Sequence, residues 1–283
     1  LNTLIGGLAG DAITTGEANV AVGYLALSDT TTGGDNTAVG ELALANNTTG
    51  FRNVALGSSA LSTKTTGNDN VAIGTSSLYA TTTASNNIAV GTGALEANTT
   101  GTSNVAVGHR TLDANTTAST NVAIGKDSML ANTTGTNNTA LGSRSLQSNT
   151  TAANNVAVGD LALGNNTTGG TNTALGTNAL QANTTASNNT AVGYKAGYSN
   201  TTGDGNTAFG YQAFLDNTTG VNNTAIGYEA NANNTTGNYN VSLGLQSLLN
   251  NTTANNNTAV GYAALFSSTT SSENVAIGAS ALA

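Results

Sequence analysis

The feature that most constrains this chain is a repeat of 17 residues that runs from Asn2 to the end without an insertion or a deletion. Each unit opens with Asn, followed by a β-branched residue, a residue that is almost always Ala, an apolar residue and Gly, as in Asn70–Gly74. There are 17 units, and the last one, which begins at Asn274, is incomplete. A strict short period is typical of a solenoid in which each repeat forms one coil. We therefore expect residues 1–283 to form a single solenoid domain.

The first half of the unit predicts a short β-strand that ends at a corner. Its second to fourth positions combine β-branched and apolar residues, which favour strands. The Gly at the fifth position is present in every unit from Gly6 to Gly278, which indicates a positive φ or a close approach of two backbones. The Asn side chains at the first position would stack along the axis and hydrogen-bond one another as a ladder. Gly and β-branched residues recur too often for a helix.

The second half of the unit predicts another short strand and then a turn. The eighth position is small and the ninth is usually Leu, as in Leu44 and Leu95. An Asn-Thr-Thr-Gly loop follows, in which Gly is often replaced by Ala, so a positive φ is not required there. The expected fold is all-β, a parallel β-solenoid whose 17-residue coils each contain two short strands.

Both Thr residues of the loop are present in all 16 complete units. Thr at a turn can bond nearby backbone groups, so we expect the pair to be mainly structural. The alternative is that regular Thr rows order water, which would make the chain an ice-binding solenoid. Adjacent strand residues face opposite sides, which argues against a single row formed by both Thr residues. In eleven units the loop reads Asn-Thr-Thr, an N-glycosylation sequence that matters if a eukaryotic secretory pathway makes the protein.

The predicted first strand is apolar or β-branched on both of its faces, as in Val71–Ile73. A strand that is apolar throughout is normally covered on both sides, whereas a thin coil covers only the inner one. The outer side therefore needs another surface. We expect a parallel homo-oligomer, most simply a trimer around a shared axis. The alternative is a monomeric solenoid with a well-packed interior.

Composition argues against several classes of function. The net charge is −8, and only 7% of the residues are charged, which disfavours nucleic acid and anionic membranes as partners. Cys is absent, the carboxylates are scattered over different repeat positions, and we expect the one His, His109, on an exposed turn. No apolar run approaches the roughly 18 residues that span a bilayer. We therefore expect no enzymatic activity, no cofactor or metal site and no membrane insertion in this segment.

Tyrosines occur at the sixth position of several units. Tyr194, Tyr211 and Tyr228 lie on three consecutive units, one repeat apart. An aromatic stripe of this kind could stack against the sugar rings of a glycan. The favoured interpretation is that the rings stack on one another and shield a strand edge. These three residues are the candidate surface contact stripe of the chain.

The motif Asn-Val-Ala-Ile-Gly at Asn70–Gly74, Asn121–Gly125 and Asn274–Gly278 resembles the core motif of the YadA-like head domains of trimeric autotransporter adhesins. The longer unit Asn206–Phe214 is similar to repeats of phage tail fibres and bacterial surface proteins. The resemblance covers the whole chain. It implies a left-handed parallel β-roll, three chains per fibre and a role in display or attachment, with no catalytic residues.

Together these expectations describe a structural fibre segment of a surface adhesin or a tail fibre, located outside the cell or on a virion surface. Neither end has the atypical unit that normally caps a solenoid, so we expect a segment of a longer protein with its anchor and binding tip elsewhere. Its partners would be other copies of the chain and a glycan or protein receptor on a host or cell surface. The alternative function is ice binding by the Thr pair.

Overall fold

The computed structural model describes residues 1–63 and 66–283, which form two compact units, Leu1–Asn138 and Thr139–Ala283. Each unit is a parallel β-solenoid in which every repeat contributes one strand of three residues. The first unit contains β1 (Thr3–Ile5), β2 (Val20–Val22), β3 (Thr37–Val39), β4 (Val54–Leu56), β5 (Val71–Ile73), β6 (Ile88–Val90), β7 (Val105–Val107) and β8 (Val122–Ile124). The second contains β9 (Thr139–Leu141), β10 (Val156–Val158), β11 (Thr173–Leu175), β12 (Thr190–Val192), β13 (Thr207–Phe209), β14 (Thr224–Ile226), β15 (Val241–Leu243), β16 (Thr258–Val260) and β17 (Val275–Ile277).

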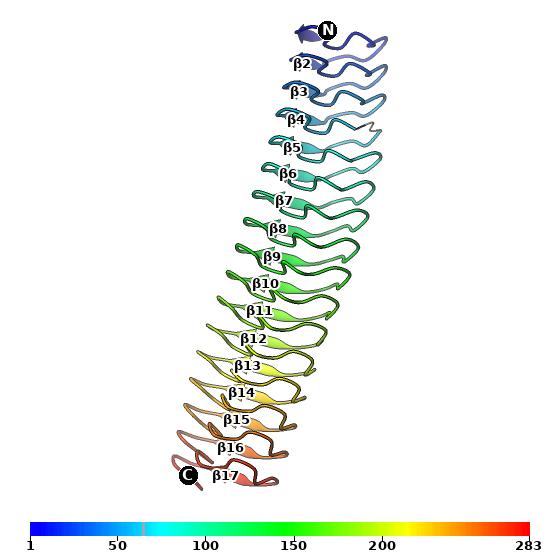
Figure 1. Cartoon of the computed structure of the whole chain (residues 1–283). Helices are drawn as coiled ribbons and strands as arrows, with labels where there is room; N and C mark the ends of the chain where they lie inside the picture. Colours follow the sequence, from blue (N-terminus) through cyan, green and yellow to red (C-terminus); the bar gives the residue numbers. More distant parts are fainter. Residues whose placement is uncertain (64–65) are drawn as a thin grey trace. The chain divides into compact units, whose positions relative to one another are not determined.

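Within each unit, consecutive strands pair in parallel, with equivalent repeat positions opposite one another (Figure 1). Val54 lies opposite Val71 in the first unit, and Thr190 lies opposite Thr207 in the second. The prediction of an all-β solenoid with one coil per repeat is therefore confirmed. The described residues contain no helix, and so none that is long and apolar enough to cross a membrane.

The core of each coil is small and lies on one side of its strand. The middle strand residue, which is nearly always Ala, is buried, as at Ala72 and Ala191. The small residue at the eighth position and the Leu at the ninth are also buried, as at Ala94 and Leu95. Small residues suit this place because a coil of 17 residues encloses little volume, which the side chains must fill closely. The two residues that flank the middle one face outward, because successive strand residues alternate in direction.

The Gly at the fifth position forms the corner after each strand, as predicted. Gly91 has a φ of +137°, a conformation that residues with a side chain rarely adopt. A Cβ atom built on Gly91 would lie 2.3 Å from the carbonyl oxygen of Gly108, the equivalent residue of the next coil. Both reasons for an invariant Gly, the positive φ and the close backbone approach, therefore apply at this corner.

The prediction of a second strand in each coil is wrong, because the segment around the ninth position forms turns. Leu42 and Leu44 have φ values of 58° and 52°, in the left-handed region. The amide of Leu42 donates to the carbonyl of Tyr24 in the preceding coil at 3.0 Å, and the amide of Leu44 donates to Ala60 in the following coil at 2.9 Å. The backbone thus bonds to both neighbouring coils without strand dihedrals. These left-handed residues also bend the chain sharply, which lets so short a coil close.

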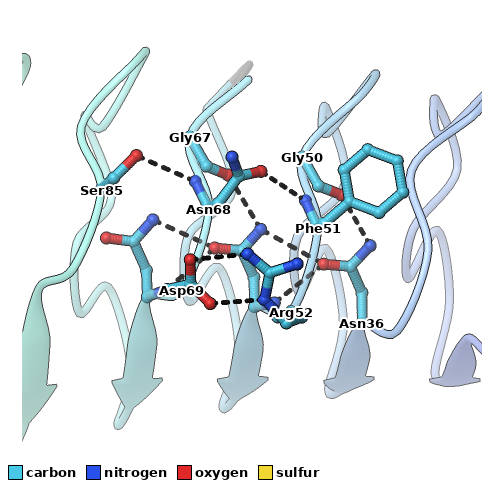
Figure 2. A network of polar contacts seen from close by, with 10 residues as sticks. Asn36, Gly50, Phe51, Arg52, Gly67, Asn68, Asp69 and Ser85 are labelled. Carbon is cyan, nitrogen blue, oxygen red and sulfur yellow. Dashed lines mark hydrogen bonds and ion pairs between the residues drawn. The ribbon is translucent and has the colours of Figure 1, made fainter.

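A column of buried Asn side chains joins the coils at the first repeat position. The backbone N and the Nδ2 of Asn53 both donate to Oδ1 of Asn36, at 2.9 and 3.2 Å (Figure 2). The Nδ2 of Asn53 also donates to the carbonyl of Gly67 at 3.0 Å. The predicted Asn ladder is therefore confirmed, and it links the strand of one coil to the coil before it.

A second column of buried Asn lies at the twelfth position, in the Asn-Thr-Thr loop, and goes beyond the ladder expected from the sequence. The Nδ2 of Asn115 donates to Oδ1 of Asn98 in the preceding coil at 2.8 Å and to the carbonyl of Ala118 at 3.1 Å. The same pair of bonds recurs in the second unit, for example at Asn217. A coil such as that of Asn115 thus carries two polar side chains inside it whose hydrogen bonds require the neighbouring coils.

Candidate functional site

The described part of the chain encloses no pocket, and it gathers no group of three His, Cys, Asp or Glu side chains that could hold a metal ion. His109 lies on an exposed turn, as predicted. What the surface presents instead is a set of side-chain rows that repeat from coil to coil. Three of these rows are candidates for function: one on the sheet, one on the loops and one at a corner.

The first row lies on the strands. We call the first and third residues of each strand the outer sheet face, because they flank the buried middle residue. These positions hold only Thr, Val, Ile, Leu and Phe, so the face is uncharged and largely apolar. Ile73 and Ile124 are 36% and 42% exposed in the first unit, and Phe209 is 54% exposed in the second. A single chain therefore leaves this side of the sheet uncovered, as the two-faced strand pattern suggested.

The second row lies on the loops, where the two Thr residues have different environments. The first of them, as at Thr116, is half-buried, and its Oγ1 donates to the carbonyl of Thr133 in the next coil at 3.2 Å. The second, as at Thr117, is exposed in all 16 complete repeats. The predicted structural role is therefore confirmed for the first Thr, while the second forms a regular exposed row. Thr65, the first Thr of its pair, lies outside the described residues.

The third row is the stack of Tyr194, Tyr211 and Tyr228 in the second unit. The ring centroids are 5.4 Å apart between the first two and 5.1 Å apart between the last two, with interplanar angles of 23° and 8°. Both faces of the Tyr211 ring are therefore covered by its neighbours, although the residue is 43% exposed. The mutual stacking favoured from the sequence is confirmed. A sugar ring could stack only on an end of this column, and Nζ of Lys195 lies over the Tyr194 ring, 5.5 Å from its centroid.

The same column of the repeat continues past the three tyrosines. Leu245 and Tyr262 occupy the sixth position of the next two units and are 44% and 57% exposed. The three preceding units carry Ser143, Asp160 and Thr177 at this position. The apolar column therefore extends over five consecutive coils. The sequence prediction covered only Tyr194, Tyr211 and Tyr228, because Leu245 interrupts the run of aromatic residues.

Charged and polar side chains at the exposed loops link neighbouring coils. Arg52 donates from Nε to Oδ1 of Asp69 at 2.7 Å and from a terminal nitrogen to Oδ2 at 2.9 Å (Figure 2). This hydrogen bonding lowers the pKa of the Asp69 carboxyl below its ordinary value. Beside the pair, Oδ1 of Asn68 accepts a hydrogen bond from the amide of Phe51 at 2.8 Å, and the amide of Asn68 donates to Ser85 at 3.0 Å. These groups satisfy one another's hydrogen-bonding capacity across neighbouring coils.

The fold places the chain in the class of parallel β-solenoid repeat proteins. No protein-family model matches the sequence, and no curated protein matches it.

Proposed function

We propose that this chain is a structural fibre segment of a surface adhesin or a tail fibre, in which parallel copies assemble through the outer sheet face. The observation that carries the proposal is the uncharged, exposed side of the sheet, which recurs in every coil of both units. Exposed apolar surface of this regularity favours association, because burying it removes apolar area from water.

The outer sheet face is large enough to act as an interface. A strand of three residues spans roughly 10 Å, and parallel strands lie about 4.8 Å apart. The eight strands of the first unit therefore present roughly 400 Å². This is about the size of the largest apolar patch on a typical soluble monomer, roughly 300–600 Å², and such patches are often functional. The second unit, with nine strands, presents a face of similar size.

Other copies of the same chain are the partners that suit this face best. The face carries no charge with which a charged partner could pair. Parallel copies related by rotation about a shared axis bring the same columns of Val, Ile and Thr together in every coil, and rotational symmetry closes the assembly. The resemblance to YadA-like heads implies three copies and a left-handed coil, and we adopt both in the proposal.

In this proposal the work of the segment is mechanical. The first Asn column and backbone bonds to both neighbours hold the coils, and most coils add the second Asn column, which suits a spacer that keeps a binding tip away from a surface. The segment itself makes at most weak multivalent contacts, for which the Tyr194, Tyr211 and Tyr228 stripe is the candidate, with a glycan or protein receptor. We place the segment outside the cell, on a cell or virion surface. The proposal includes no catalytic residue, no cofactor and no membrane insertion.

Lysine substitutions on two matched rows test the assembly. Ile73→Lys with Ile124→Lys places charges on the outer sheet face, and Thr83→Lys with Thr134→Lys places them on exposed loop positions of the same two coils. Analytical ultracentrifugation should show that the first variant dissociates, because a charge buried in an apolar interface loses its hydration. The second variant should keep the mass of the parent. Equal behaviour of the two variants would argue against an interface on the sheet.

Ice binding remains the second candidate, and the exposed row formed by the second Thr of each loop favours it. Thermal hysteresis measured on the parent chain and on a Thr100→Lys, Thr117→Lys, Thr134→Lys variant tests it. Activity that is present in the parent and lost in this folded variant would support ice binding. Absence of activity in the parent would remove this candidate and leave the fibre proposal.

A further inference from the structure

Two classes of the acceptor sequence for N-linked glycans, Asn-X-Thr, place their Asn in opposite environments in this fold. In the first class the sequence is Asn-Thr-Thr, with Asn at the twelfth repeat position: Asn47, Asn98, Asn115, Asn132, Asn149, Asn166, Asn183, Asn200, Asn217, Asn234 and Asn251. In the second class it is Asn-Asn-Thr, with the first Asn at the last repeat position: Asn137, Asn188, Asn222 and Asn256. Four further Asn-Asn-Thr sequences begin at the eleventh position, directly before an Asn of the first class, and belong to neither class: Asn46, Asn165, Asn233 and Asn250. The coil that begins at Asn172 is one of those that hold both classes, at Asn183 and Asn188.

The acceptor nitrogen is inaccessible in the first class. All eleven of these Asn residues are buried, at 1% exposure or less. The Nδ2 of Asn183 donates one N–H to Oδ1 of Asn166 at 2.8 Å and the other to the carbonyl of Ala186 at 3.0 Å. N-glycosylation would replace one of these hydrogens with the C1 atom of a sugar. The modification would therefore remove a buried hydrogen bond and force a sugar ring into the Asn column, where no space exists.

The side chain is accessible in the second class. Asn188 is exposed, and its Oδ1 accepts a hydrogen bond from Oγ1 of Thr171 at 2.6 Å. A glycan on Nδ2 leaves that oxygen free to accept the same bond. The backbone amide of Asn188 donates to the carbonyl of Gly170 at 3.2 Å, and this bond does not involve the side chain. A sugar at this position extends into solvent and leaves the coil intact.

We infer that a folded coil carries a glycan at Asn137, Asn188, Asn222 and Asn256 but excludes one at the eleven Asn-Thr-Thr positions. Attachment of a sugar to one of the eleven before folding then prevents that coil from closing. The most frequent glycosylation sequence of the chain is therefore incompatible with its fold. This division follows from the stacking of coils within one chain and does not depend on assembly or on the proposed function.

Chemical glycosylation of single cysteines tests the inference, because the chain contains no Cys of its own. Asn183→Cys and Asn188→Cys are prepared in the full chain, unfolded in urea and treated with a glycosyl methanethiosulfonate. The Cys thiolate attacks the sulfur bonded to the sugar, a disulfide forms and methanesulfinate leaves. Each sample is then refolded beside its unlabelled form, and circular dichroism and protease resistance measure the refolded fraction.

Labelled Asn188→Cys should refold as completely as its unlabelled form. Labelled Asn183→Cys should lose about tenfold or more of its protease-resistant fraction, because a buried polar site is filled and its hydrogen bonds are broken. Equal refolding of the two labelled variants would overturn the inference, as would failure of labelled Asn188→Cys alone.

A second pair covers the case in which Asn183→Cys itself does not fold. Thr81 naturally replaces Asn at the twelfth position of another coil and is fully buried, and Asn86 is exposed at the last position of that coil. Thr81→Cys changes size little, so the unlabelled chain should fold. In the folded state, Thr81→Cys should react at least about a hundredfold more slowly than Asn86→Cys, since its thiol is reached only when the coil opens. Equal reaction rates would contradict the inference.

Discussion

The Oδ1 atom of Asn36 accepts two hydrogen bonds from Asn53, one from the backbone N at 2.9 Å and one from Nδ2 at 3.2 Å. This arrangement explains why only Asn occurs at the first repeat position. Asp lacks the side-chain N–H groups, and Gln is one carbon longer, which a column of fixed spacing does not accommodate. The invariant Asn side chain thus adds hydrogen bonds between coils, in a coil whose strand has only three residues to supply backbone ones.

Removing one Asn from this column should be costly. Asn104 donates from Nδ2 to Asn87 and to the carbonyl of Ala118, and its Oδ1 accepts from the amide of Asn121. Asn104→Ala leaves these buried partners unsatisfied, so we expect a loss of about 2–4 kcal/mol in urea unfolding. The neighbouring exposed residue is the control: Ser103→Ala should change stability by less than about 0.5 kcal/mol. A loss of equal size in both variants would argue against the ladder.

The two glycines of one coil should differ in their tolerance of a methyl group. Gly91→Ala introduces a Cβ at a φ of +137°, 2.3 Å from a backbone oxygen, and should cost about 3 kcal/mol or more. Gly101 occupies the fifteenth position, where other units carry Ala84 and Ala118. A Cβ built on Gly101 would also crowd a backbone oxygen, that of Ala118, but Gly101 has no positive φ, and the Ala residues of the other units show that a coil can shift to hold this Cβ. Gly101→Ala should therefore cost clearly less than Gly91→Ala. Thermal unfolding of the two variants decides, and a larger cost at Gly101 would contradict the assignment of the corner.

The two Thr residues of a loop should also differ in their contribution to stability. Thr116→Val keeps the shape of the side chain but removes the hydroxyl that donates to Thr133, so we expect a loss of about 0.5–1.5 kcal/mol. Thr117→Val changes an exposed side chain and should leave the stability nearly unchanged. Denaturant titration compares them. If only Thr117→Val lowered the stability, the structural role would have been given to the wrong Thr.

The pair of Arg52 and Asp69 should make a pH-dependent contribution at an exposed loop. Hydrogen bonding to Arg52 holds the pKa of Asp69 below its ordinary value of 3.8. A lowered carboxyl pKa contributes stability above the pKa of the unfolded chain, and that contribution is lost as the pH falls through the lower folded value. The difference in melting temperature between the parent and Arg52→Gln should therefore be largest near neutral pH and vanish in strong acid. A difference that persists in acid would mean that Arg52 acts through packing alone.

The register, the corner and the first Asn column could be predicted from the sequence because each depends on residues that are repeated in every unit. Gly91 indicates the corner by its identity alone, because a residue with a side chain fits neither its positive φ nor the close approach of the Gly108 carbonyl. The second strand was predicted wrongly for the opposite reason. Leu44 lies in the left-handed region, where Leu is rarely found, so its identity pointed to a strand.

The stacking of coils holds Leu44 in the left-handed region, and the sequence of a single repeat does not reveal this stacking. Its side chain is fully buried, and its amide bonds to the following coil at 2.9 Å. The second Asn column was missed because Asn, Thr and Gly together are also typical of an ordinary exposed turn. The uncovered outer sheet face, in contrast, could be predicted, because Val71 and Ile73 flank Ala72 in a strand of alternating direction.

The most direct test of the central claim is the molar mass of the purified chain in solution, measured by sedimentation equilibrium at low micromolar concentration. The proposed assembly through the outer sheet face predicts a stable species of three times the 27.7 kDa of one chain. A folded, soluble species with the mass of one chain, and no association on concentration, would contradict it.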